Sequence, residues 1–307
     1  MANEALDLSI VIVSYNDREF LIQCLSSIYK NNFIYTLEII VVNNSPHPHL
    51  SKNIKGLFPD ILWIENQKNL GFVKAVNQGI KKASARYILA LNSDTVVSPG
   101  SLSALVRFMD NHEKAGAAGG KILVTQGIVQ PTCRRFPTYL TALFNRASIL
   151  TKLFNDNRFS RRYLLSRWSH ENVRRVDWVC GAFIILRREA LNDVGYLDED
   201  YFMYCEEVDW CYRAKKKGWK IYYVPEASLV HDSRHNTYVM KKIIYHHQSM
   251  NIFYRKHFGK GYILGYVVAS GIFLRAAGKL LLYTLGIPFR VLHKTFSVSK
   301  ADPTIKA

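Results

Sequence analysis

The sequence predicts an α/β fold, with a doubly wound, mostly parallel sheet and flanking helices. Tyr87–Leu91 is a run of apolar and aromatic residues without alternation, which is typical of a strand buried on both faces. Leu8–Ser14 predicts a second buried strand. Between and after these runs, strand patterns alternate with helical ones, and this rhythm is typical of a parallel sheet.

The other elements follow from the same two patterns, taken in chain order. Apolar runs predict strands at residues 8–14, 37–42, 61–64, 87–91, 116–124, 176–186, 219–224 and 227–230. Helical spacing of apolar residues predicts helices at residues 18–29, 69–85, 101–112, 204–213 and 240–258. Two further apolar runs, 262–274 and 280–289, are each shorter than the roughly 20 residues that span a bilayer.

Composition limits the class of protein. The chain has 307 residues, of which 49% are hydrophobic, as expected for a globular protein with ample core. The five cysteines are odd in number and form no CxxC pair, so neither a disulfide framework nor a zinc site is expected. A reducing compartment is the simple interpretation. Residues 1–8 lack an apolar core, so no signal peptide is expected there.

The net charge of +17 is concentrated in two segments. Residues 134–188 contain 12 basic and 3 acidic residues, and residues 241–307 contain 11 basic and 1 acidic residues. Two anion- or membrane-facing surfaces are therefore expected. A nucleic-acid-binding protein is the rival interpretation of this basicity, but it does not explain the buried parallel strands or the acidic cluster described below. No nucleic acid is therefore expected as a partner.

Polar residues follow the strand at 87–91. Asn92 and Asp94 place two oxygen donors at its carboxyl end, where open α/β sheets bind ligands, and this suits Mg²⁺ or Mn²⁺ with a diphosphate. The alternative is that Asp94 only caps a helix that opens near Pro99. The turn after the first strand, Ser14–Arg18, contains no glycine. This argues against a dinucleotide-binding Rossmann site, whose turn needs glycine.

Asn69–Gly79 has two interpretations. Gly71 at a helix start exposes backbone N–H groups, and Asn77 on the same helix would lie toward a nucleotide phosphate or ribose. Alternatively, this is a packed helix whose glycine relieves a tight turn. Gly181, inside an apolar run, likewise marks either the close approach of a ligand or a bulge.

Tyr204–Arg213 carries the acidic cluster. Glu206, Glu207 and Asp209 precede and begin an apolar helical pattern. Acidic residues in a first turn are favoured by the helix dipole alone, but three carboxylates exceed what a cap needs. Arg134 and Arg135, adjacent in a loop, either face an anion or stay solvated.

As an ordered set, these motifs resemble the family 2 glycosyltransferases with the GT-A fold, and in particular their bacterial rhamnosyltransferase-like branch. The resemblance covers Leu8 to about Gly259. The motifs that carry it are Val11–Asn16, Asn69–Gly79, Leu91–Asp94, Gly181–Phe183, Tyr204–Trp210 and Pro225–His231.

The resemblance implies a donor site. In that family the first two strand ends hold the nucleoside, a later glycine-containing segment contacts the diphosphate-sugar, and a metal-binding DxD motif follows. The matching donor-binding residues here are Ser14, Tyr15, Asn16, Asn43, Gly71, Phe72, Asn77, Asn92, Ser93 and Asp94. Asn43 stands where the family usually has Asp, and Asn92 replaces the first Asp of the DxD. His231 matches a histidine that completes the metal site with Asp94, so Mg²⁺ or Mn²⁺ is the expected cofactor.

The resemblance also implies the chemistry. Inverting transfer needs a carboxylate base, for which Glu207 and Glu206 are both candidates, with Asp209 orienting its neighbours. Arg134, Arg135, Gly181 and Ala182 are expected at the acceptor. The expected donor is dTDP-rhamnose, with a UDP-hexose as the alternative, and the expected acceptor is a glycan on a polyprenyl diphosphate. A catalytically silent scaffold is the other rival, which the intact acidic residues argue against.

These implications define the expected organisation. Residues 1–239 form the GT-A domain, with a nucleotide-sugar half at about 1–125 and an acceptor half at about 126–239. Residues 240–296 form basic, amphipathic helices that associate peripherally with the cytoplasmic face of an anionic membrane, and 297–307 are expected to be disordered. A packing or homodimerisation role for the helices is the alternative.

Overall fold

The computed structural model describes residues 6–46, 54–124, 127–139, 163, 165, 168–232, 239–259 and 263–285. The chain divides into two compact units. The first comprises Met1–Pro137 with Arg161–Thr237, and the second comprises Thr138–Ser160 with Tyr238–Ala307. The predicted disordered tail and most of the basic segment at 140–167 lie outside the described residues.

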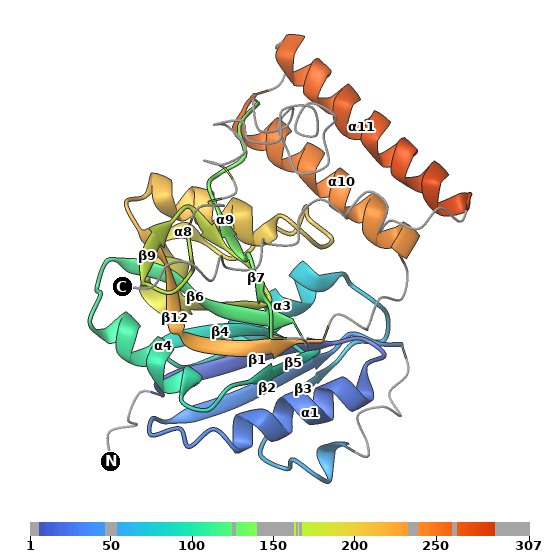
Figure 1. Ribbon diagram of the computed structural model, residues 1–307. Coiled ribbons are helices and arrows are strands. Elements are labelled where there is room, and N and C mark those ends of the chain that lie inside the picture. The colour runs from blue at the N-terminus through green and yellow to red at the C-terminus, as the bar shows by residue number, and fades with distance from the viewer. Residues whose placement is uncertain are drawn as a thin grey trace, which may run out of the picture. The chain divides into compact units, whose positions relative to one another are not determined.

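Four parallel strands form one half of the central sheet, in the order β3-β2-β1-β4 (Figure 1). They are β1 (Leu8–Ser14), β2 (Leu37–Asn43), β3 (Leu62–Glu65) and β4 (Tyr87–Asn92). Helix α1 (Arg18–Tyr29) connects β1 to β2, and α3 (Phe72–Lys82) connects β3 to β4. The doubly wound arrangement predicted from the apolar runs is therefore confirmed.

The other half of the sheet is mixed, and it continues in the order β11-β6-β12-β5. Strand β11 is antiparallel to both neighbours, β12 is parallel to β6, and β5 is antiparallel to β12. Short strands β7 and β9 pair with β6 and β12, and β8 pairs with β10 in a separate two-stranded sheet. The bounds are β5 Thr95–Val97, β6 Ala115–Val124, β7 Val129–Gln130, β8 Cys133–Arg134, β9 Arg174–Val176, β10 Trp178–Val179, β11 Phe183–Arg187 and β12 Lys220–His231.

Two strand predictions in this half were wrong. The single strand predicted at 176–186 is three short strands with different partners, because the chain turns where Phe183 donates its N–H to the carbonyl of Cys180. Conversely, the two strands predicted at 219–230 are one strand, β12. Its pairing with β6 shifts register between Val224 and Ser228, so the chain passes Pro225 without leaving the sheet.

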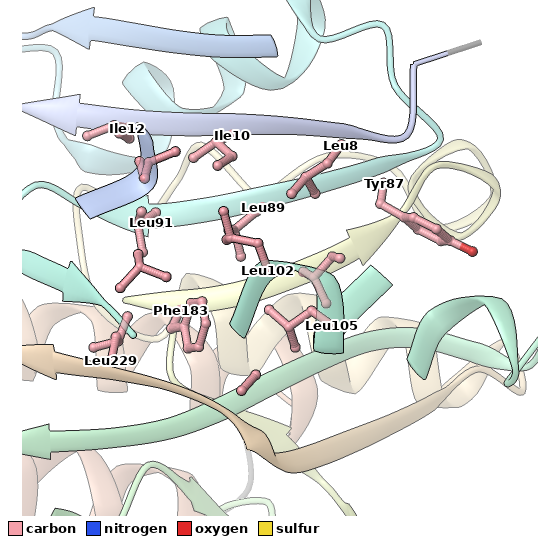
Figure 2. Packing of buried hydrophobic residues seen from close by; sticks show 14 of the residues in the cluster. Leu8, Ile10, Ile12, Tyr87, Leu89, Leu91, Leu102, Leu105, Phe183 and Leu229 are labelled. Atoms are coloured by element: carbon pink, nitrogen blue, oxygen red, sulfur yellow. The ribbon is translucent and has the colours of Figure 1, made fainter. Parts of the chain in front are cut away.

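Helices cover both faces of the sheet (Figure 1). Helices α1 and α4 (Ser101–Asp110) lie on one face, and α3, α8 (Arg188–Val194) and α9 (Glu206–Lys216) lie on the other. Figure 2 shows the core on the first face, where side chains of β1 and β4 meet those of α4 and β11. On the second face, α3 packs closely against β1 at Gly79. A Cβ added to Gly79 would lie only 2.3 Å from Val11 Cγ1.

The second unit contains helices α10 (Val239–His257) and α11 (Ile263–Thr284), which pack together around Tyr254, Val268 and Ile272. The expectation that its apolar runs are too short to span a bilayer was wrong. Helix α11 continues through Arg275 and Lys279, and its stretch Gly265–Thr284 is long and apolar enough to cross a membrane by length and composition. The reason is that α11 continues from the first run into the start of the second, as far as Thr284.

Candidate active site

The ends of β1 and β2 bring the predicted nucleoside residues together. Ser14 pairs with Asn43 in the parallel register of these strands. The Asn43 amide is buried, donating to Glu65 Oε2 at 2.7 Å and accepting from the N–H of Ser45 at 3.2 Å. Asn16 has a left-handed backbone (φ 53°) and accepts a hydrogen bond from Ser45 Oγ at 2.5 Å. Polar side chains therefore tie the two strand ends into one rigid edge, with Tyr15 half-buried between them.

Gly71 and Phe72 lie at the start of α3. Gly71 has φ 88°, and the N–H of Phe72 donates to the carbonyl of Phe202 at 2.8 Å. A Cβ on Gly71 would lie 2.9 Å from the same carbonyl oxygen, so only glycine fits. Asn44 holds this turn, donating to the carbonyl of Gly71 and accepting from the N–H of Leu70.

Asn77 lies further along α3 and is 1% exposed. Its amide donates to the carbonyl of Leu197 at 2.8 Å and accepts from the N–H of the same residue at 3.2 Å. It also donates to Glu199. Asn77 thus joins α3 to the segment before α9. Any contribution of Asn77 to donor binding would therefore be indirect, through the position of that segment.

Asp94 and His231 come together although they are far apart in sequence. Asp94 lies between β4 and β5, and His231 ends β12, where it pairs with Thr95. The N–H of Asp232 donates to the carbonyl of Asp94, and His231 Nε2 lies 3.2 Å from Asp94 Oδ1. Each side chain is about one-fifth exposed, at 20% and 21%, so both reach solvent from a fixed backbone.

This pair fits a divalent cation that takes its remaining ligands from elsewhere. A carboxylate and an imidazole are both metal ligands, and Mg²⁺ commonly combines one or two carboxylates with substrate phosphates. Within the described residues, no group of three or more His, Cys, Asp and Glu side chains could hold a metal ion. Among the described residues, Asp94 and His231 are therefore the two candidate ligands at this edge, and diphosphate oxygens or water would supply the others.

The remaining donor residues anchor the turn that carries Asp94. Asn92 donates its N–H to the carbonyl of Ala182 at 3.1 Å, which joins the predicted donor and acceptor segments. Ser93 is buried and donates its hydroxyl proton to Asp17 Oδ2. The turn is thus fixed from two sides.

The acid pair begins α9. Tyr204 and Cys205 both have left-handed backbones (φ 68° and 64°), a rare pair of conformations that turns the chain sharply before Glu206. Glu206 is 5% exposed, whereas Glu207 is half-buried. The backbone of Gly181 lies against Glu207, since a Cβ on Gly181 would be 3.6 Å from Glu207 Cβ.

The two carboxyls have different electrostatic surroundings. Burial and then the charge of Glu207 raise the pKa of Glu206 well above its usual range. Burial also raises the pKa of Glu207, but backbone N–H groups, including that of Gly181, and the charge of Arg134 oppose that rise. The surroundings of Glu207 therefore favour the charged form more than those of Glu206 do. A small pocket, lined mostly by apolar side chains, includes both residues.

Asp209 is fully buried on the same helix. It accepts a hydrogen bond from Arg213 Nε at 2.7 Å and another from Tyr201 at 3.3 Å. Arg213 also donates to the carbonyls of Val194 and Tyr196. Asp209 therefore anchors α9 to the chain before it, which suits an orienting role.

The structure separates the two predicted acceptor arginines. Arg135 lies 3.7 Å from the carboxylate of Asp177, which also accepts from Lys215 at 2.7 Å. Arg134 lies over the ring of Trp178, and its charge lowers the pKa of Glu207. Of the two, Arg134 is the one that acts on the acid pair.

Sequence reasoning did not name Asp17, Asn44 or Glu65 as site residues. Each follows a predicted strand end by one to three residues, so a rule that scores every polar residue at that edge would have found them. Their hydrogen bonds to Ser14, Gly71 and Asn43 now place them beneath the site.

Comparison with known proteins gives a family model and two relatives that match this sequence. The sequence model of glycosyl transferase family 2 matches residues 9–195. The N-acetylglucosaminyl-diphospho-decaprenol L-rhamnosyltransferase of Mycobacterium tuberculosis is 28% identical, over 71% of this chain and 83% of that protein. The poly-beta-1,6-N-acetyl-D-glucosamine synthase of Staphylococcus aureus is 26% identical over 73% of this chain, which spans half of that longer protein.

A solved structure supports the fold. The mannosyltransferase of Pyrobaculum calidifontis, determined with GDP-Man and Mn²⁺, superposes with a TM-score of 0.57 at 14% identity. The match covers 95% of this chain and 83% of that chain. The predicted GT-A fold is thereby confirmed.

Proposed function

Because the chain belongs to glycosyl transferase family 2 and is a glycosyltransferase, we propose that it is an inverting, metal-dependent enzyme that moves a sugar from a nucleotide diphosphate to a lipid-linked glycan. Within the proposal, residues 1–125 bind the donor, and residues 126–239 bind the acceptor and supply the base.

The observation that carries the proposal is that Glu207 and Glu206 line the same small, mostly apolar pocket. Two carboxyls that share one small pocket cannot easily both be charged, so their proton affinities separate. Glu206, the more buried, keeps the proton. Glu207, with N–H donors and Arg134 nearby, is the carboxylate that can accept one.

The chemistry follows from that assignment. The acceptor hydroxyl oxygen attacks the anomeric carbon, the bond from that carbon to the diphosphate oxygen breaks, and Glu207 takes the hydroxyl proton. A divalent cation held by Asp94 and His231 would supply positive charge to offset that of the nucleotide diphosphate. Attack from the face opposite the leaving group inverts the anomeric configuration.

For the substrates, we propose rhamnose from dTDP-rhamnose and a glycan on a polyprenyl diphosphate. The relative from M. tuberculosis supports the rhamnosyl group and the acceptor, because its name gives an L-rhamnosyl transfer to a decaprenol-linked acceptor. The dTDP carrier rests on the resemblance of the motifs to the rhamnosyltransferase-like branch. A UDP-hexose donor is the second candidate, supported by the relative whose name gives an N-acetylglucosamine polymer. The proposed location is peripheral, at the cytoplasmic face of the membrane, through α10 and α11.

Thermal unfolding with Mn²⁺ and a panel of nucleotide sugars tests the donor assignment. A bound ligand stabilises the folded state, so dTDP-rhamnose should raise the Tm more than UDP-hexoses at equal concentration. The Asp94→Ala variant serves as control and should lose the metal-dependent part of the shift. A larger shift with a UDP-hexose would transfer the assignment to the second candidate, and no shift with any nucleotide sugar would contradict the proposal.

A further inference from the structure

A buried carboxylate lies beneath the turn that carries Asp94. Asp17 is 8% exposed. Its Oδ1 accepts a hydrogen bond from Ser14 Oγ at 2.5 Å, and its Oδ2 accepts one from Ser93 Oγ. Ser14 ends β1, and Ser93 stands between Asn92 and Asp94 after β4. One carboxylate thus joins two strand ends.

The position of Asp17 in its own helix is unusual. It is the N-cap of α1, where an aspartate normally accepts a hydrogen bond from the first helical turn. Within the described residues, the side chain of Asp17 accepts no such capping hydrogen bond. The carboxylate is instead directed at the two serines, while the N-terminal end of a twelve-residue helix favours a negative charge there.

The opposite side of the same turn is also held. Thr95 Oγ1 donates to the carbonyl of Asn92 at 2.7 Å, and Cys24 Sγ lies 3.7 Å from that carbonyl oxygen. Burial raises the pKa of the Cys24 thiol to about 12, and the charges of Asp17 and Asp94 both contribute to the rise. The carbonyl of Asn92 is therefore contacted by side chains of α1 and β5.

We infer that Asp17 is a positioning residue for the proposed divalent cation. Through Ser93 it fixes the turn that presents Asp94, and its negative charge adds to the attraction of a cation at that turn. The inference rests on the metal-dependent function proposed above. It goes beyond that function because Asp17 does not belong to the predicted ligand set and would act without touching the metal.

A purely structural tie is the competing explanation, and the chain contains a matched control for it. At the other end of β1, Ser9 is fully buried and donates to Glu38 Oε1 at 2.5 Å. Ser9→Ala and Ser93→Ala therefore each remove one serine-to-carboxylate hydrogen bond, and Ser9→Ala also removes the bond that Ser9 Oγ accepts from the N–H of Ala85 at 3.0 Å. Only the bond of Ser93 lies at the turn that carries Asp94.

The test is Mn²⁺ binding to the full-length protein in the presence of the nucleoside diphosphate that binds, dTDP or UDP, whose oxygens would supply the remaining ligands. Electron paramagnetic resonance of the free ion measures it, against a sample that contains only Mn²⁺ and the nucleotide. Asp17→Asn keeps the size of the side chain but removes its charge, and we expect it to weaken Mn²⁺ binding about 10-fold or more, the usual effect of altering a group that orients a ligand. Ser93→Ala should weaken binding in the same range. Ser9→Ala should lower the Tm but leave the Mn²⁺ affinity as in the wild type.

The double variant of Asp17→Asn and Ser93→Ala decides whether the effect passes through Ser93. We expect it to bind Mn²⁺ no more weakly than the worse single variant, because both substitutions interrupt one path. If Asp17→Asn does not fold, the comparison of the Mn²⁺ affinities of Ser93→Ala and Ser9→Ala still tests the inference.

Two different failures can be told apart. Wild-type Mn²⁺ affinity in both Asp17→Asn and Ser93→Ala, combined with loss of binding in Asp94→Ala, would overturn this inference and leave the metal assignment intact. Equal Mn²⁺ binding by the wild type and Asp94→Ala would overturn the metal assignment itself, and this inference with it.

Discussion

Glu206 and Glu207 show how two identical side chains acquire different chemistry from their surroundings. Both lie at the start of α9, where the helix dipole favours negative charge, yet they share a pocket that excludes much of the water. Glu207 gains three backbone N–H donors and the nearby Arg134, whereas Glu206 gains only its own backbone N–H. The assignment of the base therefore depends on environment, which residue spacing does not reveal.

The first prediction separates the two glutamates by rate. Glu207→Gln should lower kcat by about 10²-fold or more, because general base catalysis typically contributes that much, with donor KM nearly unchanged. Glu206→Gln should retain most of the kcat, since an amide resembles the neutral carboxyl that we assign there. Initial rates measured with both variants check this. The reverse pattern would make Glu206 the base.

The second prediction concerns stability against pH. The pKa of Glu206 is raised above its unfolded value of 4.5. Its contribution to stability is therefore fully present below about pH 4.5 and is lost as the pH rises through the raised value. The glutamine in Glu206→Gln does not ionise, so the variant does not suffer this loss. The Tm of the variant minus that of the wild type should therefore increase with pH. A gain of about 1 kcal/mol would appear as about 2–4 °C in a chain of this size.

Tm values measured from pH 4 to pH 8 by about one-unit steps check this, with Glu189→Gln on the exposed side chain of α8 as the control. A constant Tm difference across the range would contradict a neutral Glu206.

At the scale of elements, the sequence predicted whatever depends on continuous patterns. Strands β1, β2 and β4 and helix α1 are uniform apolar or amphipathic stretches, so their bounds were predicted within a residue or two. Strands β9, β10 and β11 were merged although the run contains Gly181, because a glycine there is compatible with a bulge in one continuous strand as well as with the turn that follows Cys180. The hydrogen bonds around Asp17 were not predicted either, because they depend on which strand ends become neighbours in the folded sheet.

The third prediction tests the turn before α3. Both glycines have a left-handed backbone, in which an alanine is strained. The Cβ of Gly71→Ala would also lie 2.9 Å from the carbonyl oxygen of Phe202, whereas the Cβ of Gly100→Ala would lie in open space. We expect Gly100→Ala to lower the free energy of unfolding by about 1 kcal/mol and Gly71→Ala by about 3 kcal/mol. Urea unfolding of both variants measures this. Equal losses would show that contact with Phe202 does not restrict the turn.

The whole molecule combines a sugar-transfer unit with a basic helical unit. Helix α10 carries Lys241, Lys242, Arg255 and Lys256, and α11 exposes large apolar side chains. The exposed set on α11 is Tyr266, Val267, Phe273, Leu274, Leu281 and Tyr283. Basic residues together with exposed apolar ones favour the interface of an anionic membrane. This unit would bring the enzyme to an acceptor that is itself held in the membrane.

The fourth prediction tests that surface. Phe273 is 70% exposed on α11, and Ile34 is 81% exposed in the first unit. Phe273→Glu should reduce flotation with liposomes of anionic lipid about 10-fold, because it removes a large apolar side chain from the interface and adds repulsion. Ile34→Glu makes the same kind of change elsewhere and should float as the wild type does. Flotation of Phe273→Glu at the wild-type level would exclude α11 as the membrane surface.

The central claim is that this chain transfers a sugar to a lipid-linked acceptor with Glu207 as base and Asp94 at a divalent cation. The most direct test is the transfer of radiolabelled rhamnose from dTDP-rhamnose to N-acetylglucosaminyl-diphospho-polyprenol in the presence of Mn²⁺. We predict labelled lipid with the wild type, and at least about 100-fold less with Glu207→Gln, with Asp94→Ala, or in excess EDTA. Undiminished transfer by the two variants, or no transfer from any nucleotide sugar by the wild type, would contradict the account.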